Sequence, residues 1–77
     1  MNNKAIYLIQ IEQIRNVSKD VTQDGIEKYV EMLKNDKLIQ PIVVKKITED
    51  LYMLKDGSHR ICAHLQCGKD SVLAHII

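Results

Sequence analysis

The chain contains no Trp and no Phe, and Tyr occurs only three times in its 77 residues. The core must therefore be aliphatic, and the many Ile, Val and Leu residues supply it. An excess of charge of one sign is also missing, because 11 Lys and Arg stand against 10 Asp and Glu, a formal net charge of +1. This balance gives no general electrostatic drive toward nucleic acid or a membrane surface.

Long apolar runs are absent too, and none approaches the ~20 residues that a membrane span needs. The start, MNNKAIYLIQIEQ, lacks the apolar region and cleavage site of a signal peptide. A cytoplasmic location is the default expectation, and Cys62 and Cys67 fit reduced thiols there. If residues 59–67 are helical, the two cysteines lie about 140° apart around the axis, so no disulfide is expected between them.

The short length predicts one domain spanning residues 1–77. A domain of this size buries only about 60% of its unfolded-chain surface, which favours association into a homo-oligomer. The elements are predicted in the order β-α-β-β-α-β, an α/β (α+β) pattern with two principal helices. We expect a strand over 5–14 that runs into a bend, a hairpin over 42–54 and a last strand over 71–77.

The first helix is predicted to begin at a cap, Asp20 or Thr22, and to end at Asn35-Asp36. One stripe of this helix is apolar at i, i+3, i+4 and i+7 spacing, formed by Ile26, Tyr29, Val30 and Leu33. The second helix is expected from about His59 to Gln66, with Gly68 at the C′ position. Its predicted buried residues are Ile61, Cys62 and Leu65.

Residues 55–65, KDGSHRICAHL, place a hydroxyl (Ser58), an imidazole (His59) and a guanidinium (Arg60) at the start of this second helix. Gly57 permits positive φ and close approach of a ligand to the backbone. The first N–H groups of a helix lack intrahelical partners and carry the positive end of the macrodipole. A guanidinium fork matches phosphate oxygens, and the other two side chains can donate hydrogen bonds. The pattern predicts a phosphate-binding loop.

A well-capped helix is the alternative interpretation of the same residues. Asp-Gly is a common turn, and Ser is a leading N-cap residue. His59 and Arg60 fit this alternative less well, because the dipole favours acidic residues at a helix start. The spacing alone does not decide between the two.

The segment QPIVV (40–44), a short hairpin and LYMLKDGSHRICAHLQCGKDSVLAHII (51–77) together resemble the ParB/sulfiredoxin-like domain, also called the ParB-like nuclease domain. Members carry a Gly-x-His-Arg or Gly-x-Arg-Arg loop at a helix start, followed by an Ala, which is Ala63 here. The I-x-x-I segment before the first helix also fits. The resemblance covers about Ile9 to Ile77 and implies this family's fold, with a small mixed sheet.

The resemblance implies that a nucleotide (ATP, ADP or CTP, with Mg²⁺) binds at this loop. Gly57, Ser58, His59 and Arg60 would contact phosphate oxygens. Asp56 would shape the turn or help to hold the metal. Lys45, Lys46 and Lys55 would add positive charge beside the loop, although Lys on an edge strand also blocks aggregation.

The family differs in activity from member to member. Sulfiredoxins use a Cys immediately before the His-Arg pair, where this chain has Ser58, so cysteine-based sulfinate repair is not implied. Free-serine kinases show a similar Asp-Gly-His-His-Arg loop and need a Glu near the end of the first strand, for which Glu12 and Asp20 are the nearest acidic residues. ParB proteins bind CTP and carry a DNA-binding domain after this one, which a partner would have to supply here. Enzymatic activity stays open, as a phosphotransferase or NTPase.

A metal site is not predicted. The chain has no C-x-x-C, and His64 with Cys67 would supply two zinc ligands at most from one helix. The sequence also offers no cluster of carboxylates for nuclease chemistry. The other candidate zinc ligands are Cys62, His59 and His75.

These observations predict a small stand-alone domain that binds a nucleotide or another phosphorylated ligand through the DGSHR loop. Phosphotransfer or hydrolysis at that loop is left open. The alternative is a non-catalytic module that keeps the fold to bind DNA or a protein partner. The near-zero net charge weakens the DNA version.

Overall fold

The computed structural model describes residues 5–77, so the first four residues of the predicted domain lie outside it. A five-stranded mixed sheet and two helices confirm the predicted fold class. The elements are β1 (Ile6–Gln10), the 3₁₀ helix η1 (Ile11–Gln13), β2 (Ile14–Arg15), α1 (Gln23–Lys34), β3 (Ile42–Thr48), β4 (Leu51–Asp56), α2 (Ser58–Gln66) and β5 (Ser71–Ile76).

The strand order in the sheet is β1-β5-β3-β4-β2. The pairs β1–β5 and β3–β4 are antiparallel, whereas β3–β5 and β2–β4 are parallel. The predicted hairpin over 42–54 is therefore confirmed, with a bulge where Val43 pairs with Asp56 and Val44 with Leu54.

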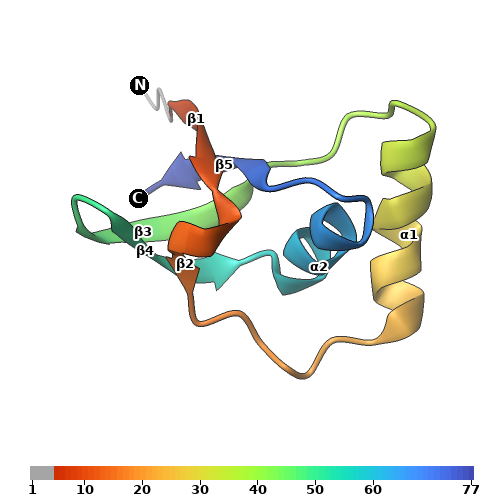
Figure 1. Cartoon of the computed structure of the whole chain (residues 1–77), viewed down its shortest axis with the longest axis horizontal. Helices are drawn as coiled ribbons and strands as arrows, with labels where there is room; N and C mark the ends of the chain where they lie inside the picture. Colours follow the sequence, from red (N-terminus) through yellow and green to blue (C-terminus); the bar gives the residue numbers. More distant parts are fainter. Residues whose placement is uncertain (1–4) are drawn as a thin grey trace.

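The predicted strand over 5–14 runs into a bend, as expected, because β1 ends at η1. The prediction missed β2, which follows η1 at the opposite edge of the sheet. In a flat sheet the outer two of five strands would lie about 19 Å apart. The chain from Gln10 to Ile14 can span only about 14 Å. The sheet must therefore curl until its two edges approach each other, as Figure 1 shows. The N–H of Ile11 donates to Asp70 C=O at 2.9 Å and ties η1 to the start of β5.

The two helices lie on the same side of the sheet, with α2 between the sheet and α1 (Figure 1). Thr22, rather than Asp20, caps α1, because its Oγ1 accepts the N–H of Gly25 at 3.1 Å. The predicted apolar stripe of α1 is buried or half-buried along its length. No helix within residues 5–77 has both the length and the apolar character to cross a bilayer.

The core is aliphatic, as predicted, and Ile42, Val44 and Ile61 are its most completely buried large side chains. The prediction for α2 is wrong in part. Ile61 is buried, but Cys62 is half-buried and Leu65 is 53% exposed. Polar residues take the inward positions instead, because each finds a backbone acceptor there, as described below. The remaining core residues are Ile9, Ile11, Ile14, Ile26, Leu54, Ala63, Val72 and Ala74.

The end of α2 matches the expected C′ glycine. Gly68 has φ 74°, and its N–H donates to Leu65 C=O at 3.0 Å while the next N–H, of Lys69, reaches His64 C=O at 2.9 Å. These bonds satisfy carbonyls that the last turn would otherwise leave free.

Strand β3 offers a matched test of this core. Ile42→Val should lower the free energy of unfolding by about 0.5–1.5 kcal/mol, because the residue is fully buried and its lost methylene leaves a void. Ile47→Val, in the same strand but 49% exposed, should change it by less than about 0.5 kcal/mol. Urea denaturation measures both values. Equal losses would contradict this assignment of the core.

Candidate functional site

The turn between β4 and α2 depends on Gly57. Its φ of 125° lies where residues with a side chain are strained. A Cβ at this position would also lie 2.5 Å from Cγ2 of Ile42. The glycine is thus required by the backbone and by packing on the core, and it fixes the start of α2 over β3.

The first turn of α2 has no side-chain cap. Gly57 is the N-cap residue and Ser58 is already helical, so the capped-helix interpretation, with Ser58 as the cap, is wrong. The first backbone bond of the helix runs from Ile61 N–H to Gly57 C=O at 3.0 Å. Within residues 5–77, the N–H groups of residues 58–60 donate no hydrogen bond. Three donors at the positive end of the helix are therefore free.

The loop that precedes α1 is hydrogen-bonded to these first residues of α2. Ser58 Oγ accepts the N–H of Ser18 at 2.9 Å, and His59 Nε2 accepts the N–H of Thr22 at 3.2 Å. Because Nε2 is an acceptor, the neutral imidazole must carry its hydrogen on Nδ1. The hydroxyl hydrogen of Ser58 and the Nδ1–H of His59 therefore remain available as donors.

Gly25 allows α1 to approach His59. A Cβ at Gly25 would lie 2.5 Å from Cδ2 and 2.8 Å from Nε2 of the imidazole. Any side chain here would displace the ring and the bond that it accepts from Thr22. Two glycines therefore set the position of His59: Gly57 in the turn that precedes it and Gly25 in α1, against its ring.

An open pocket of about 340 Å³ lies between this loop and the turn before α2. The structure brings five of the predicted site residues to it: Asp20, Asp56, Gly57, Ser58 and His59. Glu12 lies elsewhere, at a separate pocket with Gln10, Ile11, Leu65 and Asp70. The remaining lining residues of the open pocket are Asn16, Ser18, Val21, Leu54 and Lys55.

Sequence reasoning missed Asn16 and Ser18 as lining residues. Asn16 has φ 70°, and its Nδ2 donates to Leu54 C=O at 3.4 Å. The segment Asn16–Lys19 was predicted to be a loop, but nothing local to it shows that the loop folds against α2.

Arg60 is not among the residues that line this pocket, and it is 8% exposed. Its Nη1 donates to the carbonyls of Gln40 and Pro41 at 2.9 and 2.8 Å. Its Nη2 pairs with Asp56 Oδ2 at 3.0 Å. The fork that the sequence assigned to phosphate thus ties the QPIVV segment to the DGSHR loop.

The candidate zinc ligands do not assemble. Within residues 5–77, no group of three or more His, Cys, Asp or Glu side chains could hold a metal ion. Cys62 and Cys67 are both free thiols.

Residues 1–77 match the family model described as the ParB N-terminal domain. A search of curated proteins gave no match. Among solved structures, sulfiredoxin from Arabidopsis thaliana superposes with a TM-score of 0.82 at 22% identity, over 95% of this chain and 84% of that one.

Two further solved structures contain nucleotides. A free serine kinase in complex with AMP has a TM-score of 0.81 at 20% identity, over 94% of this chain. The C-terminally truncated chromosome-partitioning protein ParB from Caulobacter crescentus, complexed with CTP-γ-S, has a TM-score of 0.77 at 19% identity, over 95% of this chain. The chain spans only 30% of that kinase and 44% of that ParB. At these identities the likeness establishes the fold.

Arg60→Lys tests the structural role of the guanidinium. Lys keeps the charge but cannot reach two carbonyls and a carboxylate at once, so we expect a loss of about 1–3 kcal/mol in the free energy of unfolding. The control is Arg15→Lys, whose exposed guanidinium bonds only to the nearby carbonyls of Glu12 and Ile14, and it should stay within about 0.5 kcal/mol of the parent. Chemical denaturation gives both numbers, and an unchanged Arg60→Lys variant would refute the role.

Proposed function

The chain belongs to the ParB N-terminal domain family, and from this premise we propose that it binds a nucleotide or another phosphorylated ligand with a phosphate at the start of α2. Relatives of this fold have been solved with AMP and with CTP-γ-S. The observation that carries the proposal is the uncapped first turn of α2, whose three free N–H groups stand beside the open pocket.

The hydrogen-bond donors at the start of α2 suit a negatively charged ligand. Backbone N–H groups at a helix N-terminus bind phosphate because they are unpaired and because the dipole favours an anion there. The Ser58 hydroxyl and the Nδ1–H of His59 add two side-chain donors beside them. A Gly at the N-cap costs a helix only a few tenths of a kcal/mol relative to a capping side chain, and a bound phosphate would supply the acceptor that the missing side chain does not.

The charges that line the pocket support a metal-bound phosphate. Asp20 and Asp56 are acidic, while Lys55 is the basic residue beside them. Two carboxylates would repel a polyphosphate unless a cation lay between them. Carboxylate and phosphate oxygens are the ligands that Mg²⁺ prefers. The proposed ligand is therefore ATP, ADP or CTP with Mg²⁺.

In this proposal Arg60 positions the site. Its pair with Asp56 holds the turn, and its bonds to Gln40 and Pro41 hold the helix against the segment before β3. A direct contact between the Arg60 guanidinium and phosphate stays a prediction. Its Nε–H and the second Nη2–H are the donors left over from these bonds.

Catalysis is not part of the proposal. Glu12 lies at a separate pocket. Of the two candidate bases before α1, Asp20 is therefore the one that lines the proposed binding pocket. Turnover of a bound nucleotide, with and without an acceptor such as free serine, distinguishes an enzyme from a binder. The alternative is a non-catalytic module that binds DNA or a protein partner. It is supported if no nucleotide binds to the chain and DNA or a protein binds instead.

Ser58→Asp separates ligand binding from stability. A carboxylate at the first helical position suits the dipole and can still accept the N–H of Ser18, so the unliganded variant should melt no lower than the parent. The same charge would repel a phosphate. ATP, ADP, CTP or GTP with Mg²⁺ at ~100 times its Kd should stabilise the parent by ~2.7 kcal/mol, a rise in Tm on the order of 10 °C. The variant should lose that rise.

Lys69→Gln is the control, because it changes the net charge by the same amount just beyond the other end of α2, and it should keep the full thermal shift. An equal nucleotide shift in Ser58→Asp would contradict binding at this helix start. No shift in the parent with any of the four nucleotides would contradict nucleotide binding altogether.

A further inference from the structure

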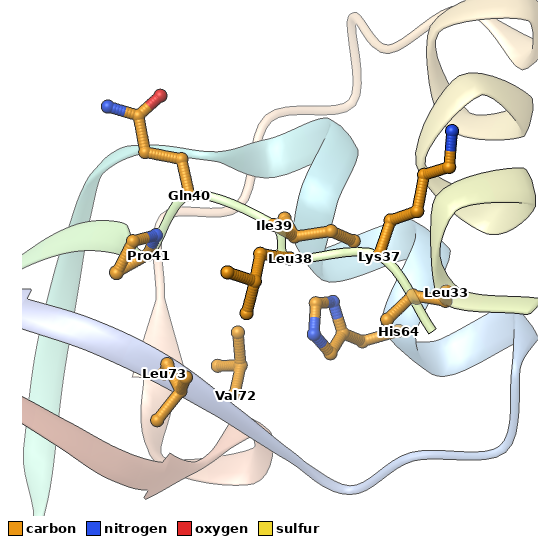
Figure 2. A pocket seen from close by; sticks show the side chains of 9 residues that line it. All are labelled: Leu33, Lys37, Leu38, Ile39, Gln40, Pro41, His64, Val72 and Leu73. Carbon is orange, nitrogen blue, oxygen red and sulfur yellow. The ribbon is translucent and has the colours of Figure 1, made fainter. Parts of the chain in front are cut away.

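A second pocket, of about 190 Å³, lies apart from the open pocket at the DGSHR loop. It is formed by α1, the segment that leads into β3, the later part of α2 and the start of β5 (Figure 2). The two pockets share no lining residue. Its lining residues are mostly apolar: Leu33, Lys37, Leu38, Ile39, Gln40, Pro41, His64, Val72 and Leu73.

His64 is the unusual member of this lining, because it is only 9% exposed. Figure 2 shows its ring between the side chains of Leu33 and Val72, whereas Leu38 at the rim of the pocket is 94% exposed. A histidine at this depth needs hydrogen-bond partners for its ring nitrogens, since an unmet buried polar group is destabilising. One nitrogen has such a partner: Nδ1 lies 2.6 Å from the carbonyl oxygen of Arg60.

The protonation of the ring follows from that bond. A carbonyl oxygen can only accept, so Nδ1 carries the hydrogen and Nε2 presents a lone pair. The two nitrogens flank Cε1 and their hydrogen-bonding directions diverge, and Nδ1 faces the backbone of its own helix. Nε2 therefore faces away from α2, and within residues 5–77 it has no protein hydrogen-bond partner and stays accessible to solvent. The result is one acceptor at an otherwise apolar pocket.

We propose that this pocket binds a small, mainly apolar molecule that carries one O–H or N–H group, which donates to Nε2 of His64. The pocket is open to solvent, and its volume of about 190 Å³ has room for a single ring, since an enclosed cavity of about 150 Å³ holds benzene. The polar groups of Lys37 and Gln40 extend away from the His64 ring (Figure 2), so the imidazole is the polar side-chain group that faces the pocket among the labelled residues. The chemical class is therefore that of a phenol.

Phenol, anisole and toluene test the proposal on the unmodified chain. The three share one ring, but only phenol has a donor. Two-dimensional NMR titration should show saturable shifts at His64, Val72 and Leu33 with all three, and phenol should bind several-fold to tenfold more tightly than anisole. Equal affinity for phenol and anisole, or shifts located at other residues, would overturn it, and so would the absence of saturation with phenol.

His64→Phe is the matched variant, because it keeps a ring of similar shape and removes the acceptor, together with the hydrogen bond from Nδ1 to the carbonyl of Arg60. Phenol should lose its advantage over anisole in this variant, while toluene should bind as it does to the parent. A retained advantage would refute the role of Nε2. If the variant does not fold, the comparison of phenol with anisole on the parent chain decides the matter alone. These titrations contain no nucleotide, so neither result depends on binding at the other pocket.

Discussion

The buried guanidinium of Arg60 is the constraint on which the two pockets depend. From the first turn of α2 it bonds the carbonyls of Gln40 and Pro41 and the carboxylate of Asp56. A buried charge is stable only with partners of this kind. The three bonds fix the helix against the end of β4 and the segment that enters β3. Since α1 packs on α2, the position of α1 follows as well.

Gly57 gives the same region its second constraint. The φ of 125° and the contact with Ile42 restrict this position to glycine whether or not a ligand binds. Such a turn delivers the helix start without a side-chain cap, and the donors of the first turn are left free. A feature that local stability disfavours is often tied to a function. The hydrogen bonds from Ser18 and Thr22 then hold the preceding loop beside those donors without occupying them.

Local patterns allowed much of the fold to be predicted, and non-local pairing set the limits. The hairpin, the bounds of α2 and the C′ glycine depend on turn residues and periodicity within a few positions. The division of residues 5–14 depends instead on which strands β1 and β2 pair with, and β5 lies some sixty residues downstream of β1. Leu65 was misplaced because hydrophobicity alone ranked it above Arg60 and His64, whose backbone partners no periodicity reveals.

The same limit applies to the candidate site. Gly57, Ser58 and His59 were predicted because they are contiguous and their turn chemistry is local. Asn16 and Ser18 were missed because only the folded loop brings them there. The opposite error concerns Glu12, which is close to Asp20 in sequence but lies at another pocket.

Arg60 also connects the two pockets chemically. Its guanidinium holds Asp56 at the first pocket and Gln40 and Pro41 at the second, and its carbonyl accepts from His64. A ligand that moves Arg60 from either side would change the affinity of the other, and linkage makes that effect reciprocal. Truncating Arg60 therefore removes a fold contact and disturbs both pockets at once. Loss of binding in such a variant would not show that the guanidinium touches the ligand, whereas Ser58 and His64 each line one of the two pockets and not the other.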